Sequence, residues 1–219
     1  MFDVPERIPK CENKQHRHLV FKSGRASTGT PISLNWWQFS FLFQTYEHEI
    51  VSDKMNAKLF APWSAKIDSI ARTKDCVETA SLIVFDLDKT DTIDINEVST
   101  WCNPYAHVVH TTFSHGENQL GGFRVYIPIR IPVMPSEYRA LHTAVLSQLP
   151  EIQKRVDTSS GDPARCYFMP SCPPNRVTLA KTAVALSGQD IDPDLLLAKA
   201  SAVARSEVIQ SAQATYNNQ

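Results

Sequence analysis

Apolar residues fall in short runs separated by polar stretches, and the runs in the middle of the chain predict strands. Residues 81–87 (SLIVFDL) are apolar and β-branched and end in acids, which is typical of a buried central strand. Residues 106–113 and 123–131 predict two further strands, and Pro128 places the later one near a sheet edge or a bulge. A short fourth strand is expected over residues 165–169, before a proline-rich stop.

Two later segments carry helical signals. A Pro-Ser dipeptide opens the first, with Ser136 as the expected N-cap and Glu137 in the first turn. Its apolar positions recur every three or four residues, at Tyr138, Leu141, Val145 and Leu149. Residues 192–214 are rich in Ala and Leu and predict the second helix, with Pro193 at a helix-start position.

The N-terminal third of the chain gives weaker signals. Residues 1–35 predict a polar, irregular arm with a candidate strand over 18–22. Residues 35–60 are rich in aromatics, and their spacing suits either a helix or a pair of strands. We expect these aromatic side chains in the core; the alternative is an exposed platform on which bases stack. They are Trp36, Trp37, Phe39, Phe41 and Phe43.

Composition and charge narrow the class of protein. A chain of 219 residues with 42% hydrophobic and 21% charged residues is ordinary for a globular protein that buries its own core. The 22 Lys and Arg balance 23 Asp and Glu, so an anionic partner must be held by a local basic patch. No run approaches the ~20 apolar residues of a membrane helix, and the N-terminus does not resemble a signal peptide. We therefore expect a cytoplasmic protein with no membrane partner.

The cysteines give no strong metal signal. There are five, and none forms a C-x-x-C pair. Cys166 and Cys172 are close in sequence, but no second Cys or His pair accompanies them, and a tetrahedral zinc site needs four ligands. We expect reduced thiols.

The strongest chemical signal is a pair of carboxylates at the end of the central strand. Asp86 and Asp88 are two residues apart, so in an extended chain their side chains project to the same face. Two like charges this close call for a cation, and Mg²⁺ or Mn²⁺ suits hard oxygen ligands. The alternative is a strand that runs out into an acidic turn, since Asp91 and Asp94 follow.

Further polar residues recur at the ends of the later strands. His115 precedes a flexible loop, and Arg124 begins the next strand; both side chain types donate to phosphate oxygens. Asp157 and Asp162 compete as a third carboxylate. Arg165 supplies a second guanidinium.

Two enzyme families share the first of these motifs. FDLDKT resembles the opening motif of haloacid dehalogenase-like phosphatases, in which Asp86 would be the nucleophile. A late Gly-Asp motif is present at Asp162, but the acid expected four residues on is Cys166.

A wider set of segments resembles the primase-polymerase domains of plasmid and phage replication proteins, in the archaeo-eukaryotic primase superfamily. These segments are FDLD, then TTFSHG with GGFRVYIPI, then VD with DPAR-x-Y-x-x-P, and together they span about residues 70–175. The resemblance implies an α+β fold: an RRM-like, mainly antiparallel catalytic sheet flanked by helices, with an N-terminal αβ module and a C-terminal helix. It implies a catalytic domain over 1–175, with a module of about 1–70 and a motif-bearing core of about 71–175, and a helical extension over 176–219.

The same resemblance implies template-directed nucleotidyl transfer that makes or extends primers by a two-metal mechanism. Asp86, Asp88 and Asp157 would hold two Mg²⁺ or Mn²⁺ ions. The implied nucleotide contacts are His115, which is also catalytic, with Ser114, Arg124 and Arg165. The implied partners are a single-stranded DNA template, nucleoside triphosphates and a replicative helicase. Scattered basic residues could contact template phosphates or simply face solvent; they are Lys54, Lys58, Lys66, Arg72 and Lys74.

A non-catalytic replication initiator that keeps this fold is an alternative. The intact set of three acids argues against it, because an inactive relative has no need to confine three carboxylates.

Overall fold

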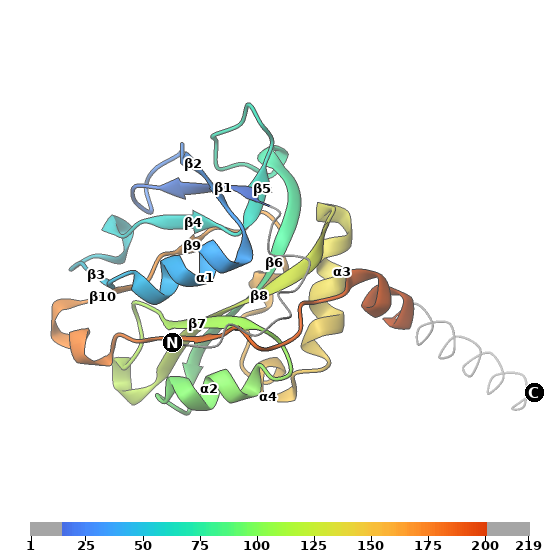
Figure 1. Ribbon diagram of the computed structural model, residues 1–219. Coiled ribbons are helices and arrows are strands. Elements are labelled where there is room, and N and C mark those ends of the chain that lie inside the picture. Colours follow the sequence, from blue (N-terminus) through green and yellow to red (C-terminus); the bar gives the residue numbers. More distant parts are fainter. Residues whose placement is uncertain (1–14, 201–219) are drawn as a thin grey trace, which may run out of the picture.

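The computed structural model describes residues 15–200, and its centre is a five-stranded antiparallel sheet (Figure 1). The strand order is β11-β7-β8-β6-β5, and every neighbouring pair is antiparallel. The predicted α+β class and the predicted antiparallel sheet are confirmed. The strands are β5 (Trp63–Ala65), β6 (Val77–Thr90), β7 (His107–Thr111), β8 (Gly121–Val133) and β11 (Thr182–Ala185).

The core of this sheet has the chain order of an RRM-like unit. β6 leads through helix α2 (Ile95–Trp101) to the hairpin of β7 and β8, and helix α3 (Pro135–Leu146) follows. The chain then returns beside β6, where Leu87 forms an isolated antiparallel bridge with Val156. In an RRM-like sheet a full edge strand would pair with β6 here, and in this structure the pairing is a single bridge.

Strand alternation divides β6 between two cores. Ile83, Phe85 and Leu87 pack with residues of α2, α3 and the short helix α4 (Pro150–Gln153). Leu82 and Val84 face the opposite side, where helix α1 (Trp36–Thr45) packs. Because side chains alternate along a strand, Asp86 and Asp88 extend on the α1 side of the sheet.

A second sheet lies on that side, in the order β2-β1-β4-β9. Its strands are β1 (His16–Phe21), β2 (Thr30–Leu34), β4 (Leu59–Ala61) and β9 (Tyr167–Phe168). The expected strand over 18–22 and the short strand over 165–169 are thus present as β1 and β9. Pairing of β4 with β9 joins the N-terminal part of the chain to the segment that carries Arg165. The boundary expected near residue 70 stays a prediction.

The remaining elements are short. β3 (Glu49–Ile50) and β10 (Ser171–Cys172) form a parallel pair. The 3₁₀ turns are η2 (Lys54–Asn56), η3 (Lys74–Cys76), η4 (Glu117–Gln119), η5 (Thr158–Gly161) and η6 (Pro174–Leu179). No helix within residues 15–200 is long and apolar enough to cross a membrane.

The aromatic segment forms helix α1, and only part of it is core. Asn35 caps the helix and Gln38 completes a capping box, which selects the helix over the strand pair. Phe39 and Phe43 are buried. The expectation of burial is wrong for Trp37 and Phe41, which are 53% and 52% exposed and stack on each other with ring centroids 5.5 Å apart. They lie one turn apart on the face of α1 that points away from both sheets.

Helix α3 begins two residues earlier than expected. Ser136 is not its N-cap: Met134 takes that position and Pro135 is the first helical residue. Proline suits this position because its φ is fixed near the helical value and it has no N–H to satisfy. The Met134 N–H is instead capped by the Glu137 carboxylate, at 3.0 Å. The predicted apolar stripe is confirmed, since Tyr138, Leu141, Val145 and Leu149 are all buried.

Two further expectations concern Pro128 and the C-terminal segment. Pro128 pairs with Leu82 beside a register shift in the β6–β8 ladder, so the predicted bulge is confirmed. Pro193 begins a helix over 193–200, as expected, and the rest of the helix predicted to 214 lies outside the described residues. The extension over 176–219 is expected to be helical, but its described part also contains β11, which adds to the edge of the main sheet beside β7.

Candidate active site

Three carboxylates converge where β6 meets the returning chain. One oxygen of each of Asp86, Asp88 and Asp157 lies within 4.8 Å of the others. Asp86 and Asp88 come from β6, and Asp157 caps the turn η5. The Asp157 backbone N–H donates to the Asp86 carbonyl at 2.8 Å, next to the bridge of Leu87 with Val156. Backbone pairing therefore sets the spacing of the three acids, which we call the acid triad.

Arg124 neutralises the most buried member of the acid triad. It lies directly across from Asp86 in the β6–β8 ladder, and its guanidinium donates to Asp86 Oδ1 at 2.7 Å. A second nitrogen donates to the Phe168 carbonyl at 2.8 Å, and the group stacks over the Tyr167 ring. The two charged side chains are 4% and 6% exposed. The phosphate contact expected of Arg124 stays a prediction; in this structure the side chain holds Asp86.

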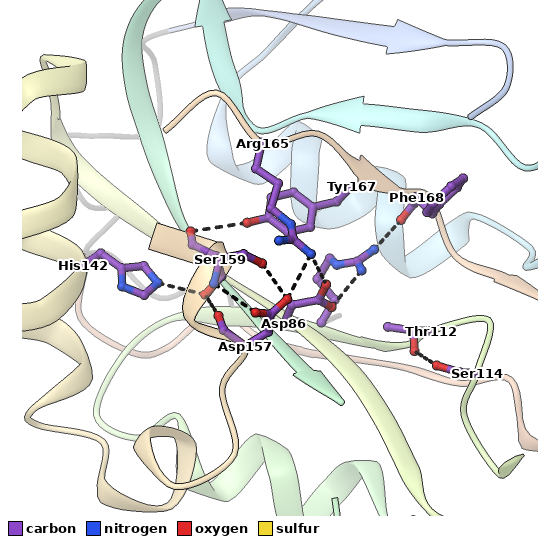
Figure 2. A network of polar contacts seen from close by, with 11 residues as sticks. Asp86, Thr112, Ser114, His142, Asp157, Ser159, Arg165, Tyr167 and Phe168 are labelled. Atoms are coloured by element: carbon purple, nitrogen blue, oxygen red, sulfur yellow. Dashed lines mark hydrogen bonds and ion pairs between the residues drawn. The ribbon is translucent and has the colours of Figure 1, made fainter. Parts of the chain in front are cut away.

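Arg165 joins two acids of the triad. One guanidinium nitrogen lies 3.2 Å from Asp157 Oδ2 and 3.4 Å from Asp86 Oδ2. Figure 2 shows this side chain reaching down between the two carboxylates from the segment before β9. Arg165 is 30% exposed, so unlike Arg124 it also faces solvent.

The three acids differ in their electrostatic environment. Hydrogen bonds from the hydroxyl and the backbone N–H of Ser159 lower the pKa of Asp157. Partial burial, and then the charge of Asp86, raise the pKa of Asp88. The Asp88 carboxylate accepts no hydrogen bond from residues 15–200. Asp88 is therefore the acid whose charge a bound cation would relieve most, and three hard oxygen donors fit a divalent ion such as Mg²⁺ or Mn²⁺.

His115 is a neutral hydrogen-bond donor beside the acid triad. Its Nδ1 accepts the backbone N–H of Gly122 at 3.2 Å, so Nε2 carries the proton of the neutral ring. Burial lowers the pKa of His115 and keeps the ring uncharged near pH 7. Gly122 pairs with Asp88 in the β6–β8 ladder, which places the His115 loop next to the acid triad.

A cleft opens beside Asp88, and we call it the Asp88 cleft. It has a volume of about 350 Å³, and its lining includes Lys54, Asp88, Ser114 and Glu117. Ser114, whose hydroxyl lies 3.4 Å from that of Thr112, belongs to the His115 loop (Figure 2). Arg176 donates to the carbonyls of Ser114 and His115 at 3.0 and 3.1 Å and so fixes that loop.

Asp162, the other candidate for the third carboxylate, lies away from Asp86 and Asp88. It lies outside the acid triad and forms an exposed ion pair with Lys74 at 3.7 Å. Of the other basic residues named from the sequence, Lys58 pairs with Glu49 at 2.6 Å.

The comparisons with known proteins identify the family. The family model described as the VapE N-terminal domain matches residues 63–202. The chain belongs to this family. The match begins at β5 and so contains the main sheet and all three acids of this VapE-type domain. A search of curated proteins finds no match.

Two solved structures are similar to the VapE-type domain. One is the primase-polymerase AEP domain of cyanophage S-2L, at 12% identity and a TM-score of 0.47, covering 84% of this chain and 87% of that one. The other is the polymerase domain of Mycobacterium tuberculosis ligase D in complex with DNA, at 14% identity and a TM-score of 0.37, covering 90% and 74%. The family match covers the residues, about 70–175, that carry the sequence motifs.

Sequence reasoning missed two residues of the site region in the VapE-type domain. Arg176 holds the His115 loop from η6, about sixty residues away along the chain. Arg139 lines a second cleft from the solvent face of α3. A lone arginine in a polar segment carries no local pattern, so neither could be distinguished from a solvated side chain.

Proposed function

We propose that this chain is a template-directed nucleotidyltransferase, a DNA primase or polymerase of phage- or plasmid-type replication that works with two Mg²⁺ or Mn²⁺ ions. The observation that carries the proposal is the acid triad, with one oxygen of each acid within 4.8 Å of the others. An arrangement of this kind is costly unless cations occupy it, because like charges repel. Arg124 pairs with Asp86 and Arg165 pairs with Asp157, so Asp88 is the acid whose negative charge still needs a cation such as a metal ion.

The residues have distinct parts in the proposed reaction. Asp86, Asp88 and Asp157 would hold the ions, and ions bound there would lower the pKa of the attacking 3′-hydroxyl and offset the charge of the triphosphate. Arg124 keeps the Asp86 carboxylate in position from the buried side. Ser114 lines the Asp88 cleft, and the next residue, His115, is 4% exposed and would donate its Nε2–H to a phosphate oxygen of a nucleotide bound there.

The phosphatase alternative fits the site less well. It needs Asp86 as a nucleophile, with a carboxylate oxygen free to attack phosphorus. Asp86 is 4% exposed, and both of its oxygens face guanidinium groups, one from Arg124 and one from Arg165. These two positive charges lower the nucleophilicity of the carboxylate, and the phosphatase reaction gives no reason for Asp88 and Asp157 to gather beside it.

The test is synthesis on single-stranded DNA with labelled nucleotides and Mn²⁺. The main variant is D88N/D157N, because these two acids are less buried than Asp86 and their amides keep the shape of the site. The matched control is D68N/E78Q, which removes two negative charges at exposed positions outside the site. Wild type and control should make product and D88N/D157N should not, with all three equally folded by circular dichroism.

Two outcomes would overturn the proposal. One is synthesis that survives in D88N/D157N. The other is a folded wild type that makes no product with any combination of ribo- or deoxynucleotide, template and divalent metal. Hydrolysis of p-nitrophenyl phosphate without template, lost on Asp86→Asn, would favour the phosphatase instead.

A further inference from the structure

A second cleft is lined by Arg165 and Ser159, which contact the acid triad, and we call it the arginine cleft. It has a volume of about 480 Å³. Its charged lining consists of four cations and one acid: Arg72, Lys74, Arg139, Arg165 and Asp162. The cations come from the β5–β6 connection, from α3 and from the segment before β9, so the fold brings three distant parts of the chain together here.

The charge of the arginine cleft is unusual for this molecule. The whole chain has a formal net charge of −1, and the Asp88 cleft carries two Lys against one Asp and one Glu. Within residues 15–200 neither Arg72 nor Arg139 forms an ion pair with an acid. The single acid, Asp162, meets Lys74 at 3.7 Å in a pair that is 80% exposed on the lysine side, and such pairs are weak. Arg165 is already paired with Asp157 and Asp86, so the excess of positive charge in the cleft comes from Arg72, Lys74 and Arg139 against Asp162, and it suits a polyanion.

Part of this positive surface is held in place. The Arg72 backbone N–H donates to the Ser27 carbonyl at 3.0 Å, and its guanidinium lies 3.3 Å from the Gly24 carbonyl. Arg165 is fixed by its contacts with Asp157 and Asp86. Guanidinium groups with a set geometry bind phosphate with a smaller loss of side-chain entropy.

The arginine cleft reaches the reacting centre directly. Arg165 lines the cleft and contacts two of the three acids. Ser159 also lines it and donates its hydroxyl to Asp157 at 2.6 Å. The Asp88 cleft opens on the remaining acid. The acid triad is thus connected to the arginine cleft by the residues that contact Asp157, and to the Asp88 cleft by Asp88 itself.

We infer that the arginine cleft binds the phosphates of a single nucleic-acid strand and leads it to the acid triad, while the Asp88 cleft takes the nucleotide. This inference rests on the proposed function, which needs a nucleic-acid strand as well as a nucleotide at the acid triad. Recognition through phosphates makes the binding independent of base sequence and sensitive to salt.

The experiment measures binding of a fluorescein-labelled oligothymidylate by anisotropy, over a series of salt concentrations, without metal or nucleotide. The test variant is R72A/R139A. Arg165 is left intact because it contacts the acid triad. A second variant, K74A/R139A, keeps the hydrogen bond of Arg72 to the Gly24 carbonyl, so a disturbed loop cannot account for both results. The control is Lys22→Ala, an exposed lysine that lines neither cleft.

R72A/R139A should weaken binding roughly tenfold or more, since each substitution removes a charge-assisted hydrogen bond to phosphate. The slope of log affinity against log salt should become shallower by about 1.4, because each phosphate of a single strand that is no longer neutralised changes the slope by about 0.7. Lys22→Ala should bind as wild type does.

The inference is overturned if both cleft variants bind the oligonucleotide as wild type does, or if wild type does not bind it. It is also overturned if the variants raise KM for the nucleotide and leave oligonucleotide binding unchanged, because the cleft would then hold the triphosphate. Binding that depends on the arginines in a wild-type protein that makes no product would support the strand site and refute the proposed function, so the two failures are distinguishable.

Discussion

The buried ion pair of Arg124 and Asp86 makes the sharpest prediction about stability. The two groups are 2.7 Å apart and 4% and 6% exposed. Arg124→Met keeps most of the side-chain stem but leaves the Asp86 carboxylate facing only the more distant Arg165, at 3.4 Å. Removing one partner of a buried pair costs about 3–5 kcal/mol, because the remaining charge is buried without compensation. That is a large part of the ~5–15 kcal/mol by which domains are stable.

The assay is urea unfolding followed by circular dichroism, in a double-mutant cycle. The double variant D86N/R124M should recover about 2–3 kcal/mol relative to the sum of the single variants, since it removes both charges. Arg25 and Asp53 provide a matched pair, also 2.7 Å apart but 58% and 49% exposed. Arg25→Met should leave the midpoint close to that of wild type. If Arg124→Met and Arg25→Met have the same effect, burial does not control the strength of the pair and the reasoning is refuted.

Three further predictions concern metal binding, pH and a glycine. Mn²⁺ at a hundredfold excess over its Kd should raise the Tm of wild type by roughly 5–10 °C but not that of the acid-to-amide double variant, by differential scanning fluorimetry; equal shifts would contradict a site at the acid triad. Burial lowers the pKa of His18 and of His142 to about 4, so the unfolded chain binds more protons below pH 6.5 and the folded state loses stability as the pH falls from 6.5 toward 4. The loss approaches roughly 1.4 kcal/mol per pH unit for each histidine, and urea unfolding at pH 7 and pH 5 should show a smaller difference in His18→Gln. Gly122→Ala would place Cβ 2.5 Å from Thr112 Oγ1 and 3.3 Å from the His115 backbone nitrogen, so it should raise KM for the nucleotide more than it lowers kcat; an unchanged KM would count against His115 as a nucleotide contact.

The central part of the fold was predictable from the sequence because its patterns are local. Strand alternation placed Asp86 and Asp88 on one face of β6, and the three-to-four spacing of Tyr138, Leu141 and Val145 identified the buried face of α3. These patterns follow from the geometry of single elements, so they need no knowledge of the partner surface.

The failures have a common physical origin in tertiary structure. Trp37 and Phe41 have the composition of core residues, but α1 buries its opposite face, and only the packed structure decides which aromatics are covered. The partners of Arg124 were likewise not predictable. Its position across from Asp86 depends on the register of β8 against β6, and its second hydrogen bond is accepted by Phe168 of the other sheet.

The single bridge between Leu87 and Val156 has a consequence for how the acid triad comes apart. Asp86 and Asp88 belong to a strand that pairs with β8 from Ala80 to Thr90. Asp157 is attached to β6 by one backbone bridge, which includes its own N–H to the Asp86 carbonyl, and by the side chain of Arg165. Local opening of the Leu87–Val156 bridge would separate Asp157 from Asp86 and Asp88 without breaking the β6–β8 pairing. The Asp157 amide hydrogen should therefore exchange with solvent faster than the amides in the middle of β6, and bound metal should slow it. Asp157 would then be the last of the three metal-binding acids to take its place. The exchange rate of its amide hydrogen would report when the acid triad is complete.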